Sequence, residues 1–490
     1  MLDRIFLQKK SLLIFIVVLQ TSVLSFLSPD PLLGVVALFC VVYIIWSRLG
    51  ALVADKLNPL REIKEDVVYD NKVITNGLTF LVIPLPFLFW VYWPIALAIA
   101  IAITLATAPL AFRQLRGIIF NQNVKKEVER RYLRIAPRIV LFISGPPQVA
   151  YQVDQWTPVL EIMPFKVVVV LRNIGIFHRM KPTKLPIFYG GNIKVLEWLF
   201  SNGPQIVLYP NNRNLNSSVM HFQYLKHIHI NHGESDKFSN QSKMLMAYDH
   251  LFVGGNLTIK RLEDSGFSMR KGQVIPVGRP QTEILLNNED KIGKPIRKIL
   301  YAPTWEGDFE ATNYCSVSPF GAEMLEMLGK QSDLQIKLKP HPMTGSASPV
   351  ARNAMQQMLE ISKLVPNIEL IDQNEDIYDV MNWSDMMICD VSAVLADYLV
   401  TEKPIALCVH FARKRSRASL AMEYPLSEAA YLLKTPGDIV DVLTAVMNGD
   451  PRKKDREHIR REAVGEPGAV ERFERKLLDI LDVEVRNSKD

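Results

Sequence analysis

The sequence predicts an α/β protein of two doubly wound halves that follows an N-terminal helical transmembrane region. From Pro137 onward, short β-branched runs alternate with amphipathic stretches, a pattern typical of parallel sheets with crossover helices. Before residue 113, two long stretches carry almost no charge, which indicates membrane-spanning helices. The 490 residues, of which 48% are hydrophobic and 22% charged, suffice for several folded domains and exclude a disordered chain.

The transmembrane region is expected in residues 1–112. The stretch from Ser11 to Trp46 has one charged residue, Asp30, in a Ser-Pro-Asp-Pro turn that divides it into two spans. The stretch from Val73 to Phe112 is uncharged, and because a span needs about 20 residues, it accommodates two more crossings. We therefore expect about four helices, with the alternative that prolines turn the third span into a re-entrant or interfacial segment.

The basic residues predict the orientation of these spans. They precede the first span and separate the second from the third, whereas the two tight turns have none, so both termini and the catalytic part are expected on the cytoplasmic side of the cell membrane. Residues 113–138 contain eight basic and two acidic residues, an excess equal to the net charge of +6 for the whole chain. This juxtamembrane linker, assigned to 113–136, indicates a positive-inside signal or a surface for anionic lipid or a polyanionic acceptor. No nucleic-acid-binding motif accompanies it.

The soluble part is expected to comprise two domains, 137–290 and 291–450, and a helical tail, 451–490. Strands are predicted in the first domain at Ile139–Ser144, Lys166–Leu171, Gln205–Tyr209 and His227–Asn231, with helices at Gln152–Met163 and Ile193–Asn202. Strands are predicted in the second at Lys298–Tyr301, Leu334–Leu338, Asn367–Ile371, Met386–Cys389 and Ile405–Val409. Since open parallel sheets bind ligands at the carboxyl ends of their strands, a site is expected in the cleft between the domains.

Several kinds of site are excluded or disfavoured. Neither GxGxxG nor GxxxxGK[ST] occurs, which removes the usual entry points to dinucleotide and P-loop chemistry. The four cysteines, Cys40, Cys315, Cys389 and Cys408, lack metal-type spacing, so reduced and mostly buried thiols are expected. No metal site is predicted.

The first candidate cluster, residues 231–237, ends the strand His227–Asn231. His232 is suited to act as a general base, Gly233 lets the backbone approach a phosphate, and Lys237 supplies positive charge. The alternative for His232 is a hydrogen-bonded structural histidine.

A second cluster follows Lys298–Tyr301, where Thr304 can donate to a phosphate or base and Trp305 can wall a nucleotide. A third follows Leu334–Leu338, where Pro340 and Pro342 enclose His341 and Lys339 lies beside it. The rigid backbone and the positive charge of the lysine suit stabilisation of a phosphate during transfer. Turn chemistry and a packed tryptophan are the structural alternatives.

The fourth cluster follows Met386–Cys389. Ser392 is expected at a helix N-terminus, where hydroxyl and amide groups can bind phosphate, and Asp397 can meet a ribose or an acceptor hydroxyl. An ordinary N-cap and a surface carboxylate are the alternatives.

In order, His-Gly…Lys, Gly-x-Pro, Tyr-Ala-Pro-Thr-Trp, Pro-His-Pro and Asp-x-Ser-x-Val-x-x-Asp resemble the motifs of the CDP-glycerol glycerophosphotransferase family, which includes teichoic-acid primases and polymerases. The resemblance covers about residues 137–480. It implies a GT-B-like pair of Rossmann-like domains, the first on the acceptor side and the second binding the CDP donor. It also implies transfer of an alditol phosphate from CDP-glycerol or a related CDP-alditol to a hydroxyl of a lipid-linked glycan or polyol-phosphate acceptor, with release of CMP and no obligatory metal or other cofactor.

The resemblance assigns roles to individual positions. The catalytic histidines fall on His232 and His341. The expected donor contacts are Asn231, Gly233, Glu234, Ser235, Lys237, Arg279, Thr304, Trp305, Lys339, Pro340, Ser392, Ala393 and Asp397.

Three positions depart from the family pattern. Glu234 brings a carboxylate near the expected phosphate, Ala393 replaces a second serine, and Gln281 replaces an arginine for which Arg279 is expected to substitute. These changes leave the identity of the alditol open. Two other functions also stay open: a GT-B glycosyltransferase that uses a nucleotide sugar, and a catalytically inactive membrane-bound scaffold for a glycan or nucleotide, which Glu234 and Ala393 favour.

Overall fold

The computed structural model describes residues 60–62, 125–236, 242–286, 295–307, 313–372 and 375–487. The chain divides into two units, residues 1–134 and 135–490. In the first unit, the described elements are strand β1 (Leu60–Glu62) and a helix that begins at residue 125. The predicted transmembrane helices of residues 1–112 lie outside the described residues, as do residues 113–124 of the basic linker. None of the helices in the described ranges has the length and apolar character needed to cross a bilayer.

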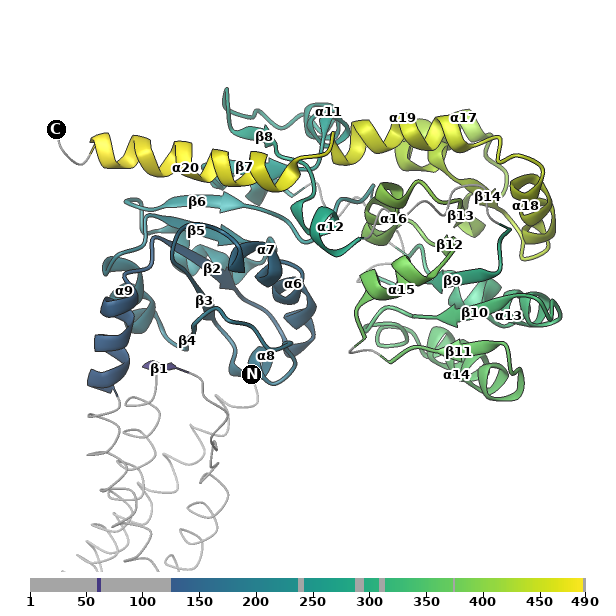
Figure 1. The fold of residues 1–490 in the computed structure, drawn as a ribbon, viewed down its shortest axis with the longest axis horizontal. Helices are drawn as coiled ribbons and strands as arrows, with labels where there is room; N and C mark the ends of the chain where they lie inside the picture. The colour runs from purple at the N-terminus through teal and green to yellow at the C-terminus, as the bar shows by residue number, and fades with distance from the viewer. Residues whose placement is uncertain are drawn as a thin grey trace, which may run out of the picture. The chain divides into compact units, whose positions relative to one another are not determined.

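The second unit contains two parallel sheets (Figure 1). We call residues 135–286 the N-half and residues 295–450 the C-half. Within the N-half the strand order is β4-β3-β2-β5-β6-β7-β8, and every pair is parallel. These strands are β2 (Ile139–Ile143), β3 (Val167–Leu171), β4 (Ile187–Gly190), β5 (Ile206–Tyr209), β6 (Lys226–His229), β7 (His250–Val253) and β8 (Val274–Pro276).

The C-half sheet is also entirely parallel, in the order β11-β10-β9-β12-β13-β14. Its strands are β9 (Lys298–Ala302), β10 (Gln335–Leu338), β11 (Ile368–Leu370), β12 (Met386–Cys389), β13 (Ile405–Cys408) and β14 (Tyr431–Leu433). In each half the strand order reverses direction beside the first strand, between β2 and β5 and between β9 and β12. Such reversal points are where open α/β sheets bind their ligands.

Helices connect the strands of both halves. Those of the N-half are α6 (Ala150–Asp154), α7 (Thr157–Glu161), α8 (Ile174–Phe177), α9 (Ile193–Ser201), α10 (Ser217–Met220), α11 (Asn256–Asp264) and α12 (Pro280–Leu285). Those of the C-half are α13 (Ala322–Gly329), α14 (Pro349–Leu364), α15 (Ile377–Trp383), α16 (Ala393–Tyr398), α17 (Arg417–Glu423) and α18 (Asp438–Met447). Several begin at a side-chain cap, as where Asn192 accepts from Val195 N and Ser348 accepts from Ala351 N.

The cores lie on both faces of the sheets. All residues of β2 and β3 are buried, which explains their unbroken β-branched and apolar sequence, because a parallel strand is covered on both sides. In the C-half one apolar cluster joins β12 and β13 to α16, and another joins β9 and β10 to α13. Cys315, Cys389 and Cys408 are buried free thiols in these clusters, as expected from their spacing.

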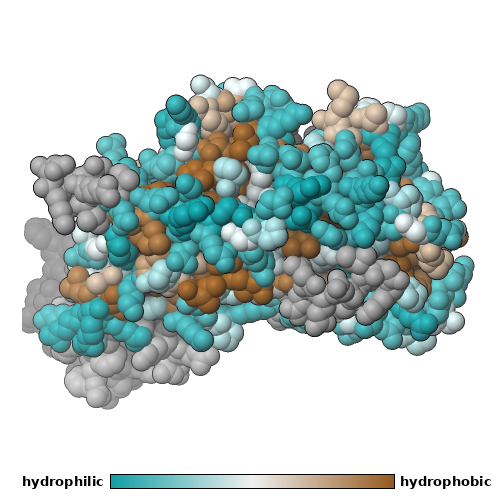
Figure 2. All heavy atoms as spheres, turned by 45° about the horizontal axis from the view of Figure 1, so that its top comes forward, coloured by the Kyte–Doolittle hydropathy of each residue, from teal (hydrophilic) through white to brown (hydrophobic). Residues whose placement is uncertain are grey.

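Two helices follow the C-half. Helix α19 (Lys453–Val464) covers part of the C-half, whereas α20 (Ala469–Asn487) returns to the N-half and runs beside β6 and β7 (Figure 1). Phe473, Leu477 and Leu481 are its fully buried apolar side chains, and Phe473 packs against Trp156 and Phe252. The face shown in Figure 2 is mostly hydrophilic, with hydrophobic side chains in smaller patches.

The structure confirms the nine predicted strands to within two residues at each end, but adds β1, β4, β7, β8 and β14, which are only three or four residues long. The single helix expected at Gln152–Met163 is wrong, since α6 and α7 are separate. Pro158 lies at the start of α7 and has no N–H to donate to an earlier carbonyl, so the helix cannot continue through it. The predicted domain boundary at residue 290 lies outside the described residues.

Candidate active site

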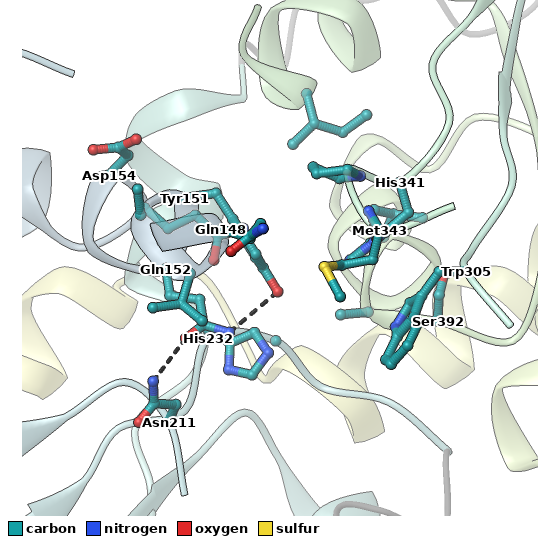
Figure 3. A pocket seen from close by; sticks show the side chains of 18 of the residues that line it. Gln148, Tyr151, Gln152, Asp154, Asn211, His232, Trp305, His341, Met343 and Ser392 are labelled. Carbon is teal, nitrogen blue, oxygen red and sulfur yellow. Dashed lines mark hydrogen bonds between the residues drawn. The ribbon is translucent and has the colours of Figure 1, made fainter. Parts of the chain in front are cut away.

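A cavity of about 1880 Å³ lies at the carboxyl ends of the strands of both halves (Figure 3). The N-half contributes loops after β2, β5 and β6, and the C-half contributes loops after β9, β10 and β12. Ordinary small-molecule pockets occupy about 300–1,000 Å³. The cavity is therefore large enough for two substrates at once.

The structure brings most of the predicted site residues together at this cavity. Those that line it are Asn231, His232, Gly233, Glu234, Ser235, Thr304, Trp305, Lys339, Pro340, His341, Ser392, Ala393 and Asp397. Lys237 lies outside the described residues. Arg279 is buried but does not line the cavity. Convergence of four clusters from separate strand ends supports the site predicted between the domains.

His232 is held by its own loop. Asn231 has a left-handed backbone with φ of 54°, and its side chain accepts from His232 N at 2.8 Å and donates to Gly233 O at 2.7 Å. The Nδ1 atom of His232 is 2.9 Å from Pro210 O. Since a carbonyl can only accept, Nδ1 carries the proton and Nε2 carries the lone pair that a general base requires.

The surroundings keep His232 neutral. Burial is the main cause that lowers its pKa to about 4, and the charges of Arg279 and Arg213 lower it further, against the opposing hydrogen bond to Pro210. At neutral pH the imidazole is therefore ready to accept a proton.

His341 lies on the C-half side of the cavity. Its Nδ1 accepts from Met343 N at 3.1 Å, so in the neutral ring the proton is on Nε2, the opposite tautomer to His232. Trp305 stacks on His341, with ring centroids 6.2 Å apart and planes 22° apart. Lys339 donates to Asp372 O at 2.8 Å, and burial lowers its pKa. The C-half thus presents hydrogen-bond donors to the cavity, whereas His232 of the N-half presents a hydrogen-bond acceptor.

Two buried carboxylates hold the C-half loops. Glu306 accepts the backbone N–H of Gly345 with both oxygens at 3.0 Å, and that of Ser348 at 3.3 Å. Asp390 accepts from Thr304 N at 2.7 Å and from Ser316 N at 3.1 Å. Because these carboxylates bind backbone N–H groups, they fix the loops that carry His341 and Thr304.

The carboxylate of Glu234 binds groups of the N-half. Its carboxylate accepts from Gly254 N at 2.8 Å and from the Thr258 hydroxyl, and it lies 3.4 Å from Arg261. Arg261 also pairs with Asp236 at 3.1 Å. The negative charge of Glu234, which lies near the expected phosphate, is therefore balanced by Arg261.

Arg279 forms a buried ion pair with Asp397. Its Nη2 and Nε lie 2.7 and 3.0 Å from the same Asp397 oxygen, and Tyr378 donates to the other oxygen at 2.9 Å. Asp397 therefore raises the pKa of Arg279, against the lowering effect of burial. Arg279 also reaches His232 O at 3.5 Å. The structure thus places Arg279 behind the cavity wall, because its guanidinium joins α16 to the His232 loop.

Gly233 and Ala393 are in close contact across the two halves. A Cβ atom on Gly233 would lie 2.3 Å from Ala393 Cβ, closer than two carbon atoms can approach. This contact explains both small residues, including the alanine that departs from the family pattern.

Four N-half residues near the strand-order reversal were not predicted from the sequence, two in helix α6 and two in the loop after β5. Tyr151 and Gln152 follow β2, and Asn211 and Arg213 follow β5; all four line the cavity. A signal was present after β5, where the polar run Asn211–Asn214 follows the strand, but these residues match no known motif.

Comparison with known proteins identifies the family. The sequence model described as CDP-glycerol:poly(glycerophosphate) glycerophosphotransferase matches residues 212–466, slightly more than half of the chain. Two relatives are the teichoic acid ribitol-phosphate polymerases TarK and TarL of Staphylococcus aureus (strain NCTC 8325 / PS 47), 23% and 22% identical over 151 residues. These alignments cover 28% of this chain and only 28% and 25% of the relatives.

The solved structure of the wall teichoic acid polymerase TagF has a similar fold, with a TM-score of 0.50 and 14% identity over 79% of this chain and 99% of that chain. This likeness confirms the predicted GT-B-like pair of parallel-sheet domains. Together with the match over residues 212–466, it confirms the resemblance predicted from the motifs: the chain belongs to the CDP-glycerol:poly(glycerophosphate) glycerophosphotransferase family.

Proposed function

We propose that this protein transfers glycerol phosphate, or a related alditol phosphate, from a CDP-alditol to a hydroxyl of a cell-envelope acceptor and releases CMP. The observation that carries the proposal is the pair of histidines of opposite tautomer, His232 and His341, that line one cavity from two halves. Family membership gives the reaction class. The names of TarK and TarL, which are ribitol-phosphate polymerases, are the reason to include other alditols.

In the proposed step, His232 Nε2 takes the proton of the acceptor hydroxyl, and the acceptor oxygen attacks the β-phosphorus of the donor in line. The bond from that phosphorus to the bridging oxygen breaks, and CMP leaves with the oxygen. His341 and Lys339 stabilise the charge on the phosphates, with Ser392 at the start of α16 beside them. The step requires no metal ion, because these groups supply the stabilising charge and hydrogen bonds.

The remaining predicted donor contacts, including Thr304 and Trp305, are proposed on the grounds that they line the same cavity. The inactive-scaffold alternative loses its support, since Glu234 is balanced by Arg261 and Ala393 is explained by its contact with Gly233.

We also propose that residues 1–112 anchor the protein in the cell membrane, with the catalytic part in the cytoplasm and a lipid-linked acceptor. The support is the two long uncharged stretches and the basic residues beside them. The full chain should stay with membranes after a carbonate wash, and a reporter fused at its C-terminus should report a cytoplasmic location. Extraction into the soluble fraction would contradict the anchor.

The test of the activity is release of CMP from CDP-glycerol by the full chain with a lipid-linked acceptor. His232→Ala should abolish it, whereas His221→Ala, an exposed histidine that does not line the cavity, should not. A panel of CDP-, UDP- and GDP-linked donors distinguishes the reaction classes, since a glycosyltransferase would release a nucleoside diphosphate. Full activity in His232→Ala would overturn the assignment of the base.

A further inference from the structure

Tyr151 lies between the two histidines of the cavity. Its ring is perpendicular to both, with centroid distances of 6.0 Å to His232 and 6.0 Å to His341. Figure 3 shows its hydroxyl pointing into the cavity, beside His232 and toward Met343. Neither the motifs nor the proposed mechanism gives this residue a role.

A chain of buried amides determines the direction of the hydrogen bond at this hydroxyl. Asn211 Nδ2 donates to Ser144 O at 3.0 Å, and the same nitrogen donates to Gln152 Oε1 at 2.9 Å. Gln152 Nε2 then lies 3.1 Å from the Tyr151 hydroxyl oxygen. Ser144 O can only accept, and a reversed Asn211 amide would face it with an oxygen. The Asn211 amide, and with it each hydrogen bond of the series, therefore has one orientation.

This orientation makes the Tyr151 oxygen an acceptor toward Gln152. The hydroxyl hydrogen therefore points away from Gln152, and the hydroxyl group faces the cavity. Burial is the main cause that raises the pKa of Tyr151, against the lowering effects of Gln152 and Arg213, so the phenol keeps its proton at neutral pH. Tyr151 can thus donate a hydrogen bond but cannot act as a base.

We propose that the Tyr151 hydroxyl donates a hydrogen bond to a non-bridging oxygen of the phosphate that is transferred. This inference rests on the proposed function. The acceptor oxygen bonds to phosphorus, its proton goes to His232, the bond to the leaving CMP breaks, and Tyr151 keeps its proton throughout. The transition state of phosphoryl transfer carries negative charge on the non-bridging oxygens. A donor fixed in advance by the Asn211–Gln152 hydrogen bonds therefore stabilises it without reorganising.

The first test is Tyr151→Phe in the full chain, which keeps the ring between the histidines and removes only the hydroxyl. Loss of one preorganised donor is expected to lower kcat for CMP release by about 10²- to 10³-fold. The KM for CDP-glycerol and the Tm should change little. Tyr224→Phe is the matched control, since Tyr224 is exposed and its hydroxyl bonds to Ser201, away from the cavity.

The second test changes the direction of the hydrogen bond and keeps the hydroxyl. Gln152→Glu replaces the donor Nε2 with an acceptor, so that Tyr151 donates to Glu instead of to the cavity. It should reproduce the kcat loss of Tyr151→Phe, and the double variant should be no slower than either single variant.

The outcomes separate the two proposals. Wild-type kcat in Tyr151→Phe, with CMP released normally by the wild type, overturns the role of Tyr151 alone. Absence of CMP release by the wild type overturns the proposed function and this inference with it. A loss confined to KM, or a Gln152→Glu variant as fast as wild type, also contradicts donation to the transferring phosphate.

Discussion

Two hydrogen-bond networks beside the cavity, one in each half, are built from different chemical groups. On the N-half side, the chain Ser144–Asn211–Gln152–Tyr151 consists of a carbonyl, two amides and a phenol, all uncharged. On the C-half side, the carboxylates of Glu306 and Asp390 accept backbone N–H groups. The N-half network therefore orients a side-chain hydrogen, whereas the C-half carboxylates fix the path of the backbone around them.

Each network suits a different requirement of the reaction, which is to direct a proton in the N-half and to hold phosphates in the C-half. A network that must direct a hydroxyl hydrogen benefits from neutral dipoles, since these set a direction and add no charge beside His232. A side that must hold phosphates benefits from rigid loops, and carboxylates can provide rigidity where backbone N–H groups absorb their charge. Substitutions at the contacts between the two halves should therefore disturb the cavity most.

The largest effect is expected at the ion pair of Arg279 with Asp397, whose side chains are each 3% exposed. Asp397→Ala leaves Arg279 buried without its partner, which should lower the free energy of unfolding by about 3–5 kcal/mol. Denaturant unfolding measures this. Asp479→Ala, which breaks an exposed pair with Lys476, is the control and should cost less than about 1 kcal/mol. Equal losses in the two variants would contradict the importance of the buried pair.

The contact of Gly233 with Ala393 should give the next effect. Gly233→Ala introduces a carbon atom 2.3 Å from Ala393 Cβ, and overpacking of this kind costs about 1–3 kcal/mol. The variant should also release CMP more slowly, since His232 is the neighbouring residue. Ala393→Gly removes the obstructing atom and should restore both stability and rate to Gly233→Ala. Failure of this rescue would mean that Gly233 is required for another reason.

The burial of His232 should be visible in the pH profile. The base must be unprotonated, so activity falls as pH falls through the pKa of His232, about 4, instead of near the ordinary value of about 6.5. The kcat/KM for CMP release should stay level from about pH 8 to about pH 5. Because the pKa of His232 is lower in the folded state than in the unfolded state, protonation favours the unfolded state. The stability of the fold therefore decreases as pH falls below about 6.5. Arg213→Met removes a charge that lowers this pKa and should move the acid limb to higher pH.

The smallest effect is expected at the edge of the cavity. Lys181 and Asp376 join the two halves at 2.7 Å, but the lysine is 42% exposed. Lys181→Met should change the free energy of unfolding by less than about 1 kcal/mol, with a smaller difference at high salt. A change as large as that of Asp397→Ala would show that the exposed contacts, and not the buried ones, hold the halves together.

Much of the fold and part of the site could be predicted from the sequence. Buried parallel strands such as β2 and β12 leave unbroken apolar runs, and the clusters at His232 and His341 directly follow such strands. The roles of Glu234, Arg279 and Ala393 could not be predicted, because each depends on a partner far along the chain, such as Asp397 for Arg279. The role of Tyr151 could not be predicted either, because Gln152 and Asn211, whose side chains orient its hydroxyl, are 59 positions apart.

Helix α20 has a consequence for the order in which the protein is completed. Phe473 of α20 packs on Trp156, and the indole of Trp156 donates to Asn231 O, in the loop that holds His232. A ribosome synthesises α20 after both halves, so the N-half core stays incomplete until the C-half has been synthesised. The support of the His232 loop thus forms only after the C-half has been synthesised, although His232 itself belongs to the N-half.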